Sequence, residues 1–254
     1  MFKSTLILLS ILFIASCATE PPKGKTAAES LYKESLELVE SGRLILANER
    51  LNQLKSQHPY SYYATPAELL QADILFKQEN YVEAAAAYML FRDFHPRNKK
   101  IDYVVWRIAE SYYNQIPDTY DRDLSSGREA VKYYYEVVQK YPNFKDMSLV
   151  KEKITSIQKM LEQKEAYIAD FYYRTEVFQA ARIRYQMILS ERKNFVATDE
   201  LRNLAMIRIS DSSRLAGNFD QCLDDYSLYI NMIEDKSKDE LNKVKEKCQQ
   251  KDNG

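Results

Sequence analysis

The sequence predicts an all-α protein, an α-solenoid of about five helical-hairpin repeats. Its 254 residues include only 5 glycines and 7 prolines, too few turn residues for the many short strands of an all-β fold. In addition, a pattern of small, aromatic and proline residues recurs along the chain with a period of about 34 residues. One hairpin of this size cannot bury its apolar face alone, so successive hairpins must stack.

The recurring pattern is most complete in residues 79–96. A turn is followed by Tyr81, then by Ala84 and Tyr88, and Pro96 ends the helix. This order resembles the second helix of a tetratricopeptide (TPR) repeat. The small residue marks a helix crossing, where it lets two backbones approach closely. Equivalent small residues recur at Ala47, Ala130, Ala181 and Cys222.

The first helix of each repeat should carry a matching small residue twelve positions earlier, and the count reaches Ser35, Ala72, Ala169 and Ser210. In the third repeat the matching Ala109 precedes Ala130 by 21 positions, which predicts an inserted loop at residues 117–125. Residues 148–174 lack a stop signal, so we expect an unusually long helix there. Residues 236–251 are highly charged and predict a terminal capping helix that frays.

Residues 1–16 are typical of a lipoprotein signal peptide. Lys3 is followed by a short apolar run and then by small residues before Cys17. The run is too short to span a bilayer, and its end resembles the bacterial lipobox, which implies acylation of Cys17. Ala18 in place of aspartate then implies delivery to the periplasmic face of the outer membrane. The alternative is an ordinary secretory signal that leaves Cys17 free.

The predicted organisation is a signal peptide, a lipidated flexible tether, an N-terminal array, a C-terminal array and a capping helix with a frayed tail. These parts cover residues 1–16, 17–27, 28–146 (repeats 1–3), 147–235 (repeats 4 and 5) and 236–254. Two further cysteines, Cys222 and Cys248, lie in the last two parts. Cys222 is expected to be a small buried apolar residue, although a bridge to Cys248 is possible in an oxidising periplasm.

Composition and motifs argue against nucleic-acid binding and against catalysis. The formal charge is −1, and loss of Lys3 with the signal makes it −2, whereas nucleic-acid binders carry a basic excess. No phosphate-binding loop, nucleophile elbow or zinc-protease motif occurs. His58 and His95 each precede a proline at a repeat end, which suits helix ends better than a metal site. We therefore expect no enzyme activity, no cofactor and no metal.

Aromatic residues are the strongest indication of a binding function. In a TPR array the first helix of each repeat lines the concave wall, where rigid rings and a few polar groups suit capture of a peptide with aromatic side chains. The alternative is that several of these side chains belong to the core. The predicted substrate-peptide groove contains Tyr32, Phe76, Tyr103, Trp106 and Tyr113, with Leu36, Leu69, Asp73 and Glu110 beside them.

The lipobox and the repeats combine with three short motifs, Ile101-Asp102-Tyr103-Val104, Asp121-Arg122-Asp123 and Tyr141-Pro142-Asn143. Together they resemble the BamD family, lipoproteins of the outer-membrane β-barrel assembly machinery. The resemblance implies a scaffold without enzyme activity. Its N-terminal half would bind the C-terminal signals of unfolded barrel substrates, and its C-terminal half would bind the POTRA domains of a BamA-like barrel subunit.

The resemblance also implies a partner-binding arginine in the second helix of the fourth repeat. Counting from Phe178 places it at Arg184, and the neighbouring Arg182 keeps that helix basic. Two alternatives stay open, one among binding proteins and one among enzymes. One is a TPR lipoprotein adaptor in cell-envelope or cell-division maintenance, and the other is a lipid-anchored hydrolase, for which no nucleophile and base stand in a recognisable context.

Overall fold

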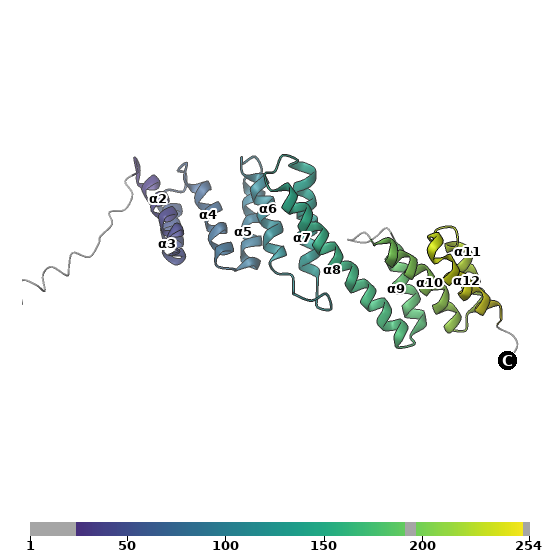
Figure 1. The fold of residues 1–254 in the computed structure, drawn as a ribbon. Coiled ribbons are helices and arrows are strands. Elements are labelled where there is room, and N and C mark those ends of the chain that lie inside the picture. The colour runs from purple at the N-terminus through teal and green to yellow at the C-terminus, as the bar shows by residue number, and fades with distance from the viewer. Residues whose placement is uncertain (1–23, 191–196, 251–254) are drawn as a thin grey trace, which may run out of the picture. The chain divides into compact units, whose positions relative to one another are not determined.

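The computed structural model describes residues 24–190 and 197–250, and every regular element in these ranges is an α-helix, as predicted. The chain forms two compact units, residues 1–83 and 84–254. The first unit holds α2 (Ala27–Glu40), α3 (Leu44–Gln57), α4 (Ala64–Lys77) and the first residues of α5 (Tyr81–Phe94). The second holds the rest of α5, then α6 (Ile101–Tyr113), α7 (Ser125–Lys140), α8 (Met147–Arg174), α9 (Phe178–Leu189), α10 (Asp199–Leu215), α11 (Phe219–Tyr229) and α12 (Asp235–Gln249) (Figure 1).

In the first unit, α2 and α3 form a hairpin against which α4 packs. The Thr26 side chain begins α2 by accepting a hydrogen bond of 3.1 Å from the Glu29 amide. Gly42 (φ 75°) takes the left-handed conformation in the turn between α2 and α3, which favours glycine. The core is made by apolar residues of all three helices: Leu38, Val39, Ala47, Leu51, Leu54, Ala67, Leu70 and Ile74.

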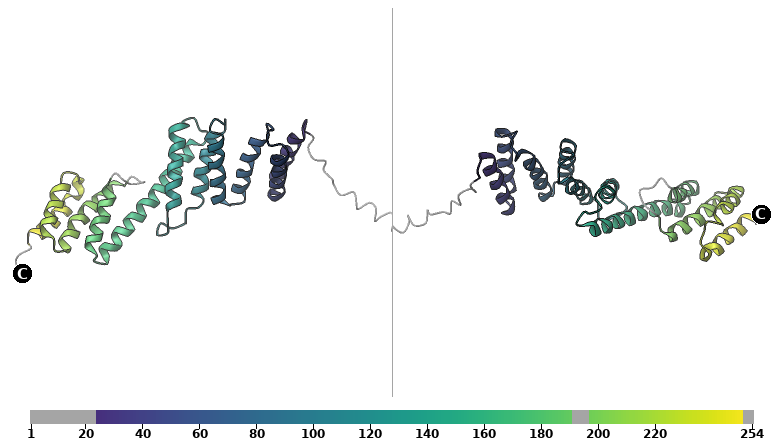
Figure 2. Two further views of the ribbon diagram at one scale, coloured as in Figure 1. Left: turned by 180° about the vertical axis from the view of Figure 1, so that it is seen from behind. Right: turned by 90° about the horizontal axis from the view of Figure 1, so that it is seen from above.

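The second unit stacks α6 with α7, α8 with α9 and α10 with α11, and α12 packs on the last pair. The predicted long helix is confirmed, because α8 has 28 residues. No glycine or proline interrupts it. It contacts both α7 and α9, and the views from behind and above show it running from one to the other (Figure 2). The predicted boundary between the two arrays, at residues 146 and 147, falls inside this unit.

The predicted repeat frame is confirmed by burial. All ten crossing residues have 0% exposure, which is what two closely approaching backbones require. Four residues after the crossing position, the second helices of repeats two to four carry a fully buried tyrosine that fills the groove beside it, namely Tyr88, Tyr134 and Tyr185. The ten crossing residues are Ser35, Ala47, Ala72, Ala84, Ala109, Ala130, Ala169, Ala181, Ser210 and Cys222.

The C-terminal helix α12 is held by three buried side chains, Leu241, Val244 and Cys248. A disulfide joins Cys248 to Cys222 on α11. The expectation that Cys222 is a free buried apolar residue is therefore wrong: it is fully buried, but α12 packs on α10 and α11 and brings Cys248 to it. The cross-link also opposes the fraying expected for this helix.

Candidate functional site

The five aromatic residues of the predicted groove lie on α2, α4 and α6. Tyr32 and Phe76 belong to the first unit, whereas Tyr103, Trp106 and Tyr113 belong to the second. Tyr103 and Trp106 lie together, whereas Tyr32, Phe76 and Tyr113 each lie in a different cluster. The single groove across all five residues stays a prediction.

In the first unit, Tyr32 and Phe76 each pack against another ring. The ring centroid of Tyr32 is 5.5 Å from that of Tyr63, and the ring centroid of Phe76 is 5.2 Å from that of Tyr81. Burial raises the pKa of Tyr32, and the negative charge of Asp73 acts in the same direction. Tyr32 and Phe76 are half-buried, so each offers only part of its ring to a ligand.

On α6, Tyr103, Trp106 and Arg107 share one face because they are spaced three and four residues apart. Arg107 Nε donates a hydrogen bond of 2.8 Å to the Tyr103 hydroxyl, and its guanidinium carbon lies 4.9 Å from the Trp106 ring centroid. Phe144, from the turn before α8, places its ring centroid 5.7 Å from that of Trp106. Phe144 is buried, whereas Tyr103 and Trp106 are partly exposed and, with the cation, suit an aromatic peptide ligand.

Arg107 and Phe144 are members of this cluster that the sequence analysis missed. The spacing of four residues from Tyr103 could have identified Arg107, whereas only the packing of the α7–α8 turn on α6 brings in Phe144. The Trp106 indole Nε1 is buried and has no hydrogen-bond partner among the residues that the structure describes. A buried donor of this kind is costly to leave unpaired.

Tyr113 lies seven residues after Trp106, about 10 Å along α6, and belongs to another cluster. Lys153 Nζ is 4.3 Å from its ring centroid. The carboxylate of Glu110, which is 7% exposed, accepts hydrogen bonds of 2.6 Å from the Tyr134 hydroxyl and from Lys153. Burial and this carboxylate raise the pKa of Tyr134 far above its ordinary value. The expectation that Glu110 lines the groove is wrong, because it joins α6 to α7 and α8.

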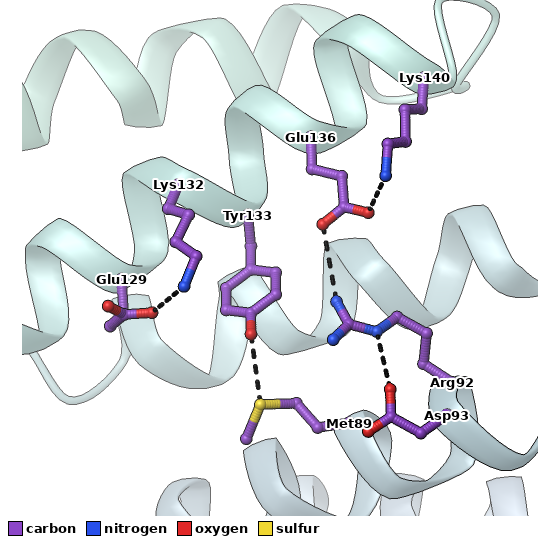
Figure 3. A network of polar contacts seen from close by, with 8 residues as sticks. All are labelled: Met89, Arg92, Asp93, Glu129, Lys132, Tyr133, Glu136 and Lys140. Atoms are coloured by element: carbon purple, nitrogen blue, oxygen red, sulfur yellow. Dashed lines mark hydrogen bonds and ion pairs between the residues drawn. The ribbon is translucent and has the colours of Figure 1, made fainter. Parts of the chain in front are cut away.

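A second polar network joins α5 to α7 (Figure 3). Arg92 of α5 reaches Glu136 of α7 at 3.6 Å, and Glu136 also binds Lys140 at 2.9 Å. Beside them, the Tyr133 hydroxyl donates a hydrogen bond of 3.3 Å to the sulfur of Met89. Arg92, Tyr133, Glu136 and Lys140 line an open hollow of about 670 Å³. Arg92 also contacts Asp93 at 3.5 Å, so the two cations Arg92 and Lys140 face two carboxylates.

Arg182, one of the two arginines predicted to bind a partner, is engaged within the chain. Its guanidinium makes two hydrogen bonds, of 2.6 and 2.9 Å, to the carboxylate of Asp225 on α11. Asp225 is 3% exposed and accepts a further hydrogen bond of 2.7 Å from the Ser213 hydroxyl. The hydrogen bonds to Asp225 raise the pKa of Arg182. This network holds α9, α10 and α11 together.

Arg184 lies two residues further along α9 and therefore on a different side of the helix. Its guanidinium carbon is 6.0 Å from the ring centroid of Tyr172 on α8. Within residues 24–190 and 197–250, no carboxylate lies at ion-pair distance from it. Of the two arginines, Arg184 is the one that can offer its charge to another protein.

The predicted inserted loop is confirmed between α6 and α7, and its C-terminal half is tied to the start of α7 and to α8. Asp123 accepts hydrogen bonds from the Ser125 hydroxyl at 2.6 Å and from the Ser125 amide at 3.2 Å, which lower the pKa of Asp123. The backbone carbonyl of Arg122 accepts a hydrogen bond from Lys164 on α8. The loop thus helps to fix α8 against the third repeat.

The described residues contain no group of three histidine, cysteine, aspartate or glutamate side chains that could hold a metal ion. His58 and His95 stand at the ends of α3 and α5, one in each unit, as predicted. No helix in the described part of the chain is long and apolar enough to cross a membrane. Cys17, the predicted acylation site, lies outside the described residues.

Known proteins with similar sequences include several assembly factors. The chain is 27% identical to the outer membrane protein assembly factor BamD of Neisseria meningitidis serogroup B, over 85% of this chain and 88% of that protein. It is 28% identical to the protein of the same name from Rickettsia prowazekii, over 85% and 84% of the two chains. A tetratricopeptide repeat protein from Parabacteroides merdae, known from its crystal structure, aligns with 14% identity over 88% and 90% of the chains, with a TM-score of 0.39.

A family match covers most of the chain. Residues 25–214 match the YfiO family, which is described as an outer membrane lipoprotein. The matched range includes α2 to α9 and nearly all of α10, and therefore the aromatic cluster on α6 and the two arginines of α9. The chain belongs to the YfiO, or BamD, family of outer membrane lipoproteins.

Proposed function

We propose that this protein is a lipid-anchored scaffold without enzyme activity that takes part in assembling β-barrel proteins into the outer membrane. The observation that carries the proposal is the family match over residues 25–214, together with relatives named outer membrane protein assembly factors. A stack of helical hairpins suits this role because it presents long walls on which several partners can bind at once.

The anchor is the acylated Cys17, at the periplasmic face of the outer membrane. The Cys222–Cys248 disulfide supports this compartment, because such bonds form and persist in an oxidising environment such as the periplasm. Several acyl chains on one cysteine are expected to hold the body at the bilayer surface, since each buried CH₂ contributes about 0.8 kcal/mol.

The C-terminal repeats bind the POTRA domains of a BamA-like subunit, with Arg184 as the contact. The absence of an ion-pair partner for Arg184 in the described chain supports this assignment. Arg182 supports the same surface by holding α9 against α11 through Asp225.

The N-terminal repeats bind the C-terminal signals of unfolded barrel substrates. Tyr103 and Trp106 are the principal contacts on α6, where Arg107 lies against both rings. Tyr32, Phe76 and Tyr113 are further contacts from their own clusters.

Affinity capture from detergent-solubilised membranes tests the scaffold proposal. The wild-type protein should co-purify with a POTRA-bearing barrel protein, and Arg184→Glu should reduce that capture at least about tenfold, because reversing one charge of a close interfacial pair costs roughly 2 to 5 kcal/mol. Arg202→Glu, the same change on α10, is the matched control and should bind normally. Equal capture by the wild type and Arg184→Glu would contradict the assigned contact, and capture of cell-division proteins alone would favour the adaptor.

A second titration separates the substrate surface from the POTRA surface. Tyr103→Ala with Trp106→Ala should weaken binding of a labelled peptide from a barrel C-terminus, because truncation of an aromatic anchor costs more than about 1 kcal/mol. The same double variant should bind POTRA domains normally. Unchanged peptide affinity would remove α6 from the substrate site.

A further inference from the structure

The turn between α3 and α4 exposes two tyrosine rings to solvent. We call residues 58–63 the tyrosine loop. Tyr60 is 100% exposed and Tyr62 is 85% exposed, whereas the third tyrosine of the loop, Tyr63, packs on the core of the first unit. Tyr62 packs edge-on against Tyr63, with ring centroids 5.5 Å apart, but most of its surface is exposed to solvent.

The loop is a fixed turn and not a loose connection. The Ser61 amide donates to the His58 carbonyl at 3.0 Å, and the Ala64 amide donates to the Ser61 carbonyl at 3.1 Å. These bonds fix the backbone of the loop. Tyr60 and Tyr62 project from this fixed turn and are exposed to solvent.

The repeat itself does not require tyrosines at this place. The corresponding turn at residues 95–100 contains Arg97, Lys99 and Lys100, and the one at residues 141–146 contains Lys145 and Asp146. Residues 56–67, in contrast, include no lysine, arginine, aspartate or glutamate. This turn thus combines exposed aromatic rings with the absence of formal charge, as protein segments at a lipid–water interface do.

The tyrosine loop also lies beside the place where the chain enters the first unit. The Tyr63 ring packs on Tyr32, in the second turn of α2. Just before α2, the Gly24 amide donates to the Ser30 hydroxyl at 2.9 Å and the Lys25 amide donates to the Glu29 carboxylate at 2.8 Å, so the chain is tied to the first turn of the helix.

The chain between Cys17 and Gly24 is too short to take this surface far from the anchor. Seven residues span at most about 25 Å even when fully extended. An acylated Cys17 therefore keeps the start of α2, and with it the tyrosine loop, within reach of the headgroup layer. Tyrosine suits that layer because its ring is apolar and its hydroxyl can form hydrogen bonds with water.

We propose that the tyrosine loop rests on the phospholipid bilayer that holds the acyl chains of Cys17, so that Tyr60 and Tyr62 form a second contact with the membrane. The inference rests on the lipid anchor of the proposed function. It gives the first unit a defined orientation at the membrane, which a lipid anchor at one residue alone does not provide.

Tryptophan fluorescence of the full-length lipidated protein in phospholipid vesicles tests this contact. Trp106→Phe removes the one natural tryptophan, and Tyr60→Trp or Tyr62→Trp is then added singly. The matched control is Ile45→Trp, at a 74% exposed position near the start of α3, about 20 Å along that helix from the loop. Brominated acyl chains in the vesicles quench only rings that reach the bilayer.

We expect the Tyr60→Trp and Tyr62→Trp proteins to show a blue-shifted emission and roughly twofold or more stronger quenching than the Ile45→Trp protein, since interfacial rings lie near the acyl chains. Equal quenching of all three in a protein whose Cys17 is shown by mass to be acylated would overturn this inference alone. A blue shift that arises only when a barrel C-terminal peptide is added would overturn it in favour of a peptide site. A protein that carries no acyl chain on Cys17 would overturn both this inference and the proposed anchor.

Discussion

The contact between α9 and α11 and the contact between α5 and α7 are each made by an arginine of one helix and a carboxylate of the other, but their surroundings differ. Asp225, which binds Arg182 at 2.6 Å, has a side chain that is 3% exposed. Glu136, which faces Arg92 at 3.6 Å, has a side chain that is 22% exposed (Figure 3). The first carboxylate also has a buried hydroxyl donor in Ser213, whereas the second is shared with a surface lysine.

This difference shows where the second unit is rigid and where it can adapt. A buried carboxylate with several donors tolerates no change of register between its helices, because any shift leaves a charge desolvated and unpaired. A carboxylate near water can exchange one partner for another or for solvent at little cost. The α9–α11 contact is therefore expected to fix the geometry around Arg184, whereas the α5–α7 contact tolerates small movements of its helices.

The largest expected loss of stability comes from breaking the buried α9–α11 contact. Asp225→Ala leaves Arg182 without its partner and should lower the free energy of unfolding by about 3 to 5 kcal/mol, the usual cost of breaking a buried ion pair. Chemical denaturation followed by circular dichroism measures it. Asp225→Leu combined with Arg182→Met removes both charges and should lower the free energy of unfolding much less. If the double variant is as unstable as the single one, the loss comes from packing and not from the unpaired charge.

Loss of the disulfide should cause the second largest loss of stability, because the bond fixes the same C-terminal end of the second unit. The bond joins residues 26 positions apart, and closing a loop of that length contributes about 2 to 4 kcal/mol. Reduction by a dithiol, or Cys222→Ser with Cys248→Ser, should lower the denaturation midpoint accordingly. The reductant should leave the midpoint of the double variant unchanged. A midpoint that is the same with and without the bond would show that α12 packing alone holds the last repeat.

Overpacking the helix crossings beside the two contacts should cost a similar amount of stability, although the contacts themselves differ. Ala181 of α9 and Ala130 of α7 both have 0% exposure, so Ala181→Leu and Ala130→Leu should each overpack a crossing and cost about 1 to 3 kcal/mol. Lys243→Leu on the exposed side of α12 is the control and should cost about 0.5 kcal/mol or less. A much larger loss for Ala181→Leu would mean that the rigidity of the α9–α11 contact extends to the crossing itself.

Much of the fold could be predicted because its requirements are local in the sequence. Every crossing has a small residue, and every second helix has a large residue four positions after it. All ten crossing residues are buried as predicted. The length of α8 was also readable, since a run without glycine or proline has nothing to stop it.

The candidate site was predicted less well, because its contacts join distant residues. Glu110 binds residues 24 and 43 positions away, and Arg182 binds a residue 43 positions away. Such pairs depend on the register of one hairpin against the next, which no local pattern specifies. For the same reason the sequence allowed a Cys222–Cys248 disulfide but could not distinguish it from a free Cys222. It also could not assign Phe144 to the α6 cluster.

The smallest expected loss of stability comes from breaking the more exposed α5–α7 contact. Glu136→Gln keeps the volume of the side chain but removes the charge that Arg92 and Lys140 share. Exposed ion pairs contribute about 1 kcal/mol or less, so the denaturation midpoint should move slightly at low salt, and high salt should remove the difference between variant and wild type.

The pH dependence of the same variant gives an independent reading of this contact. The hydrogen bond to Glu136 raises the pKa of Lys140. A raised pKa in the folded state means that the stabilisation is complete below the ordinary pKa of lysine and is lost as the pH rises through the raised value. The wild type should therefore lose a little stability in that alkaline range, and Glu136→Gln should not show this loss. A loss in Glu136→Gln as large as that of Asp225→Ala, and insensitive to salt, would show that the α5–α7 contact is as rigid as the α9–α11 contact.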